Sequence, residues 1–176
     1  MNLRLLTLSV LVGVVALSLA LPSAAMADTT SATVTVTGGS LSISAPTAAG
    51  NLGSSADTVG GETISGPLGS VEVTDARGAA AGSGWVASVI STAFTPSAGP
   101  AIPASDVSYV AGTISKVGTA TYTADNPADL TGTVAAVTAT GITGDNSATW
   151  SPTITVTVPG GMASAVYTAT ITHSVV

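Results

Sequence analysis

The sequence predicts an all-β protein, an antiparallel β-sandwich of Ig-like or barrel-like form that follows a cleaved signal helix. Short runs such as 153–158 alternate Val or Ile with Thr, and this period of two places the apolar residues on one face of a strand. Clusters of Gly, Pro, Asn and Asp separate the runs and are typical of turns. No stretch carries the i, i+3, i+4, i+7 apolar spacing of a helix. Short strands joined by such turns indicate a sandwich or a barrel.

The first 27 residues have the layout of a secretory signal. Arg4 provides a positive start, residues 5–21 form an apolar run, and Ala25-Met26-Ala27 is a small-x-small cleavage site. The run is shorter than the roughly 20 residues of a membrane-spanning helix, and no basic residue follows it before Arg77. We therefore predict a signal peptide at 1–27, a secreted protein without membrane attachment after cleavage, and one β-sandwich domain at 28–176.

Each predicted strand is justified by its own pattern. Residues 33–37, 41–44, 71–74 and 153–158 alternate polar and apolar side chains. In the predicted strand 165–172, Tyr167, Ala169 and Ile171 share one face. In chain order the predicted strands are 33–37, 41–44, 71–74, 85–92, 107–111, 120–124, 133–138, 153–158 and 165–172. The predicted turns are Gly38-Gly39, Gly60-Gly61, Gly66-Pro67, Gly82-Ser83-Gly84, Gly99-Pro100, Asp125-Asn126-Pro127, Gly144-Asp145-Asn146 and Pro159-Gly160-Gly161.

Charge and cysteine content exclude several function classes. The formal net charge is −6, and only Arg77 and Lys116 are basic after residue 27. Such a chain cannot neutralise phosphates, so we expect no nucleic-acid partner and no binding to anionic membranes. With no cysteine, the exported domain has no disulfide and depends on packing.

Nothing in the sequence indicates catalysis or a cofactor. His173 is the one histidine, and no Gly-x-Ser-x-Gly elbow accompanies it. The carboxylate pairs Asp57 with Glu62 and Glu72 with Asp75 are candidates for acid–base chemistry, but alternation places Glu72 on the polar face of its strand. No glycine pair opens a helix or precedes a lysine as a phosphate loop does. We therefore predict a non-enzymatic protein with no catalytic residue and no cofactor.

Acidic turns are the one place where a metal could bind. Asp125, Asn126 and Asp129, or Asp145 with Asn146, offer oxygen ligands, but the twelve-residue calcium loop is missing. Asp-Asn-Pro is a good turn former in its own right. The prediction is a structural role and no metal site, with calcium binding by the loops as the alternative.

The segment 71–94 is the most distinctive part of the chain. An alternating strand ends at Thr74, Asp75 and Arg77 enter a glycine-rich stretch, and Trp85 opens the next strand. This pattern predicts a hairpin with a long loop, in which Asp75 pairs with Arg77 and glycines adopt positive φ.

Asp75, Arg77, Gly78, Gly84 and Trp85 carry a family resemblance. The chain here resembles the WxL family, the non-covalently wall-bound surface proteins of Gram-positive bacteria, in which a Gly-Trp-x-Leu motif commonly follows an Asp-x-Arg-Gly-like turn. The distal counterpart is 167–172. Position 87 is Ala rather than Leu, and the distal Trp-x-Leu is missing at His173-Ser174-Val175. The resemblance implies a β-rich module that binds peptidoglycan.

The two tryptophans are assigned different roles. Trp85 shares the apolar set of its strand with Ala87 and Val89, which favours a core position over an exposed platform. Trp150 lies between a Gly-Asp-Asn turn and Pro152 and is the better candidate for an exposed residue that stacks on a sugar. The predicted ligand-binding residues are Trp85, Trp150, Asp75 and Arg77.

Two functions follow as expectations. The first is an exported, non-enzymatic surface protein that associates non-covalently with the cell wall and binds peptidoglycan. The alternative is a structural or adhesin-like subunit of a surface assembly, whose partner is another surface protein and whose free edge strands pair with neighbours. A secreted enzyme is a third, weaker reading.

Overall fold

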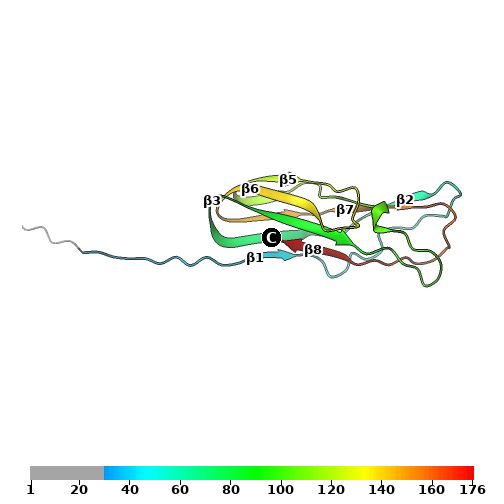
Figure 1. Ribbon diagram of the computed structural model, residues 1–176, viewed down its shortest axis with the longest axis horizontal. Helices are drawn as coiled ribbons and strands as arrows, with labels where there is room; N and C mark the ends of the chain where they lie inside the picture. The colour runs from blue at the N-terminus through cyan, green and yellow to red at the C-terminus, as the bar shows by residue number, and fades with distance from the viewer. Residues whose placement is uncertain (1–29) are drawn as a thin grey trace, which may run out of the picture. The chain divides into compact units, whose positions relative to one another are not determined.

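The computed structural model describes residues 30–176 (Figure 1). The predicted signal peptide at 1–27 lies outside the described residues. The chain divides into two units, Met1–Thr35 and Val36–Val176. In the described part of the first unit, residues 30–35 form no strand and their side chains are exposed. All of the strands described below belong to the second unit.

The second unit is built from antiparallel strands, which confirms the predicted fold class. One sheet has the order β1-β3-β6-β5 with β8 also paired to β3, and the other has the order β2-β7-β4. The elements are β1 Leu41–Ser44, β2 Glu62–Pro67, β3 Val71–Ser91, the 3₁₀ turn η1 Ala104–Asp106, β4 Val107–Val110, β5 Ser115–Ala124, β6 Val134–Trp150, β7 Thr153–Val158 and β8 Ile171–Val175. Among residues 30–176, no helix has the length and apolarity needed to cross a membrane.

The long strands β3 and β6 run side by side and determine the architecture. Their register shifts between Asp75 and Ala79 and again between Ala79 and Ser83, and β3 curves back on itself at one end of the second unit (Figure 1). Gly78 and Gly82 have φ of 62° and 89°, conformations that glycine adopts readily. These bulges let one strand turn the corner between two layers.

Because β3 bends, its two ends pair with different edge strands. Residues 72–75 pair with β1, and residues 87–91 pair with β8. The inward side chains form one hydrophobic core that also includes the inner face of the β2-β7-β4 sheet. Its largest members include Trp85, Trp150, Tyr109, Leu130 and Ile154. The predicted inward set of Trp85, Ala87 and Val89 is confirmed.

Several local predictions are wrong. The hairpin expected at 71–94 is the single strand β3, since its glycines form bulges rather than a turn, and the turns expected at 82–84 and 144–146 lie within β3 and β6. The Gly66-Pro67 turn is the end of β2. Residues 33–37 form no strand, because they have no partner strand among the described residues. The last strand begins only at Ile171, and before it Thr168 makes an isolated bridge to Thr95.

Candidate functional site

Asp75 and Arg77 form the ion pair that the sequence predicts. Arg77 Nε donates to Asp75 Oδ1 at 2.8 Å, Arg77 Nη2 donates to Oδ2 at 2.9 Å, and the Arg77 backbone N–H also donates to Oδ1. The Asp75 side chain is fully buried, whereas that of Arg77 is 37% exposed. The hydrogen bonds from Arg77 lower the pKa of Asp75 below its ordinary value. The carboxylate therefore stays ionised inside the protein.

The same carboxylate continues into a buried network. Asn146 Nδ2 donates to Asp75 Oδ2 at 3.2 Å, and Asn146 Oδ1 accepts hydrogen bonds from Trp85 Nε1 at 3.0 Å and Tyr122 Oη at 3.1 Å. The Trp85 and Tyr122 rings lie 5.6 Å apart between centroids. Arg77 Nη2 also donates to the carbonyl of Gly84. The network ties both sides of the β3 bend to β5 and β6, so its first role is structural.

Three predicted site residues therefore come together, and the fourth does not. Trp85 is 2% exposed and Trp150 is 1% exposed. The expectation that Trp150 is an exposed stacking residue is wrong, because it lies on the buried side of β6 rather than after a turn. Neither indole offers a ring face to a sugar, and Arg77 is the accessible member of the predicted set.

Trp150 belongs to a second buried polar chain, which the sequence reading missed. Its Nε1 donates to Tyr109 Oη at 2.6 Å, and Tyr109 Oη lies 3.4 Å from His173 Nε2. Burial raises the pKa of Tyr109 to about 12 and lowers the pKa of His173 below its ordinary value. Both groups are therefore neutral at pH 7. These three side chains connect β6, β4 and β8 through the core. No carboxylate is part of this set, so it does not form a hydrolytic triad.

The acidic turn residues are engaged in local hydrogen bonds. Asn126 Oδ1 accepts from the Ala111 backbone N–H, Asp125 Oδ2 accepts from Thr138 Oγ1, and Asp129 Oδ1 accepts from the Thr131 backbone N–H. In residues 30–176 no group of three or more His, Asp or Glu side chains is placed to hold a metal ion. The contacts indicate that these residues shape the turns.

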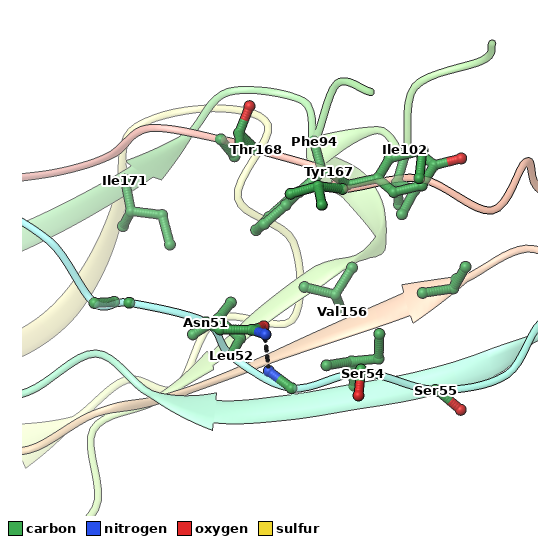
Figure 2. Close-up of a pocket in the computed structure, with 18 of the residues that line it drawn as sticks. Asn51, Leu52, Ser54, Ser55, Phe94, Ile102, Val156, Tyr167, Thr168 and Ile171 are labelled. Atoms are coloured by element: carbon green, nitrogen blue, oxygen red, sulfur yellow. Dashed lines mark hydrogen bonds between the residues drawn. The ribbon is translucent and has the colours of Figure 1, made fainter. Parts of the chain in front are cut away.

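A wide groove of about 1,020 Å³ opens between the layers. Val156 of β7 and Leu52 of the segment between β1 and β2 lie on one side, and Phe94, Tyr167 and Ile171 lie on the other, with their side chains directed into the gap (Figure 2). Ser54, Ser55 and Thr168 also line the groove, with their hydroxyl oxygens directed away from the gap (Figure 2). The lining combines apolar side chains with hydroxyl and amide groups, and its charged residues among the described part of the chain are Asp57 and Glu62. It is suited to binding an uncharged chain rather than to acid–base chemistry.

The outer face of the β2-β7-β4 sheet is a second candidate surface. The inward residues Ile154 and Val156 are buried, so the alternate residues of β7 face outward. In register, Thr63 lies opposite Thr157 and Ser65 opposite Thr155, and the hydroxyls of Ser65 and Thr155 lie 2.7 Å apart. The outward hydroxyl residues are Thr63, Ser65, Ser108, Thr153, Thr155 and Thr157. We call this set the hydroxyl face.

Comparison of the chain with protein-family models, with curated proteins and with solved structures gives no match.

Proposed function

We propose that this chain is an exported, non-enzymatic surface protein that associates non-covalently with the bacterial cell wall, with peptidoglycan as its partner. The observation that carries the proposal is the hydroxyl face, an array of Ser and Thr side chains without a charged member. Hydroxyl groups can both donate and accept hydrogen bonds, which matches the hydroxyl and amide groups of a glycan. The overall charge of −6 argues against retention by ionic contacts with anionic wall polymers.

The test is co-sedimentation of the secreted protein with purified peptidoglycan at low and high salt. The proposal predicts that the protein sediments with peptidoglycan and that added salt does not release it, since the contacts are uncharged. Replacing Thr153, Thr155 and Thr157 by Val removes three hydroxyls at nearly constant shape and should reduce the bound fraction several-fold.

The matched control replaces Thr119, Thr121 and Thr123 of β5 by Val, in the other sheet. This variant should bind as the wild type does. Recovery of the wild-type protein entirely in the unbound fraction, or equal loss in both variants, contradicts the assignment of wall binding to the hydroxyl face.

A second candidate function is a subunit of a surface assembly, and the edge of β8 favours it. Val86 and Val176 exchange both backbone hydrogen bonds, and the Thr92 N–H donates to the Thr170 carbonyl. In an antiparallel pair the residues between such positions direct their backbone groups away from the partner strand. Ile171 and His173 therefore present unpaired backbone groups on the far side of β8, where no strand pairs with it among the described residues. A clean monomer in size-exclusion chromatography at high concentration contradicts this candidate.

A further inference from the structure

Residues 30–37, which we call the arm, have the sequence of a strand but form none in this structure. Thr33, Thr35 and Thr37 alternate with Val34 and Val36, and the two valines are 89% and 90% exposed. Alternating Thr and Val is typical of a strand with one buried face. Val34 and Val36 therefore give the arm an apolar face that the described residues leave exposed.

The groove has the complementary features. The edge of β8 next to it has unpaired backbone groups at Ile171 and His173, and both residues also line the groove. Apolar side chains such as Leu52, Ile64 and Ile171 are only half-buried there. An extended segment added along β8 would satisfy the backbone groups, and alternate side chains of that segment would fill the groove.

Charge permits this pairing. Residues 30–44 contain no charged side chain, so no ionised group of the arm has to leave water when the arm enters the groove. The acidic groups of the groove, Asp57 and Glu62, have no like charge to repel on the arm.

Connectivity indicates that the arm comes from another copy. The residues directly after the arm are tied to β3, because the Gly39 N–H donates to the Ala76 carbonyl and the Ala76 N–H donates to the Ser40 carbonyl. The arm therefore enters β1 from the end near Leu41, whereas the groove is lined by residues 45–57, which leave β1 at its other end.

We propose that the arm of one copy docks as an added strand along β8, in the groove of a second copy. An arm and a groove at different places on one molecule make a head-to-tail contact, so repeated docking produces open chains. This inference rests on the second candidate function, assembly at the surface. It uses a surface separate from the hydroxyl face, so peptidoglycan binding can fail or succeed independently.

The experiment uses the chain from Asp28 onward, which holds every described strand, in sedimentation velocity over a range of concentrations. The wild type should form species heavier than the monomer in proportions that rise with concentration. The double variant Val34→Asp/Val36→Asp places charges on the arm, and Leu52→Asp places one in the groove. Each variant alone should remain monomeric.

Mixing the two variants gives the sharpest outcome. The arm variant keeps an intact groove and the groove variant keeps an intact arm, so an equimolar mixture should form one-to-one heterodimers and nothing larger. The control Val117→Asp changes a valine that is 70% exposed on β5 and should assemble as the wild type does. Circular dichroism of every variant checks that the sheet content is unchanged.

Three results overturn the proposal. The first is a wild type that stays monomeric at all concentrations, and the second is an arm variant that assembles as the wild type does. The third is a mixture that recovers no heterodimer although both variants are folded. If the wild type stays monomeric and Leu52→Asp abolishes peptidoglycan co-sedimentation, the groove is a wall-binding site instead of a docking site for the arm.

Discussion

At the residue scale, the Asp75–Arg77 pair is expected to matter for folding before it matters for binding. Arg77→Ala leaves a fully buried carboxylate with Asn146 as its remaining side-chain donor. Loss of a partner to a buried polar group costs about 1–3 kcal/mol, so the free energy of unfolding should fall by that amount in urea denaturation. The control is Lys116→Ala, which removes the other basic residue after position 27. This change should alter the free energy of unfolding by less than about 0.5 kcal/mol. Equal small effects of both changes contradict the structural role.

The Trp150–Tyr109 hydrogen bond gives a second prediction at this scale. Tyr109→Phe removes the acceptor of the buried Trp150 N–H and should lower the free energy of unfolding by about 1–3 kcal/mol. Tyr167→Phe removes a hydroxyl whose hydrogen bond to the Ala163 carbonyl is exposed, and its effect should stay within about 0.5 kcal/mol. A Tyr109→Phe protein as stable as the wild type in thermal unfolding refutes this role.

His173 predicts a pH dependence with a defined sign. Burial lowers the pKa of His173 in the folded protein below the ordinary value of 6.5, so the unfolded chain takes up a proton first as the pH falls. The stability that the neutral His173 contributes to the folded protein is fully present above about pH 6.5. It is lost as the pH falls toward the folded-state pKa, and the free energy of unfolding then decreases by at most about 1.4 kcal/mol per pH unit. Tyr109, with a pKa of about 12, stays neutral throughout this range.

The measurement is the urea midpoint from pH 7.5 to pH 5 for the wild type and for His173→Gln. The variant should lose less stability over this range than the wild type does, since it has no group at this position that titrates there. Parallel pH profiles for the two proteins are the contradicting outcome.

The residue-scale results also show where sequence reasoning stops. Alternation within 85–89 was enough to predict that Trp85 is buried. A similar period of two runs along β6, where Ile142, Asn146, Ala148 and Trp150 are all buried. This period indicates that Trp150 belongs to the core. Turn chemistry at Gly144 obscured that signal. The partners Tyr109 and His173 are distant in sequence, so no local pattern could identify them.

At the element scale, the glycines of β3 and β6 are the main difference between expectation and structure. Glycine with positive φ serves a bulge as well as a turn, and the sequence alone does not distinguish the two. Pairing of β3 with β6 along most of its length decides in favour of the bulge. The prediction of a strand at 33–37 is wrong for a related reason. A strand needs a partner strand, and a local sequence pattern does not show whether one is present.

The bulge in β6 gives a prediction with a matched control. Gly144 has φ of 71° and no atom within 4 Å of an added Cβ, whereas Gly132 has the same free space without a positive φ. Gly144→Ala should lower the free energy of unfolding by about 1–2 kcal/mol, the cost of a left-handed conformation for a residue with a Cβ. Gly132→Ala should be neutral or stabilise by up to about 1 kcal/mol. Similar effects of the two changes in urea denaturation are the outcome that contradicts a backbone role for Gly144.

At the largest scale, the unit Val36–Val176 is a bent antiparallel sandwich with a buried network at the bend and an open groove. The sequence was sufficient for the fold class because period-two alternation is a local property. The groove was not predictable, since it is formed by residues 45–57, β7 and residues 162–171, which only the folded topology brings together. The groove and the unpaired arm are therefore the features that the structure adds.

Hydrogen–deuterium exchange at increasing protein concentration tests the central claim most directly. Docking of the arm along β8 predicts that amides of residues 33–37 and of 169–175 both become protected as concentration rises, while residues 115–119 of β5 keep a constant exchange rate. Fast exchange in the arm at every concentration, with no change along β8, contradicts the account.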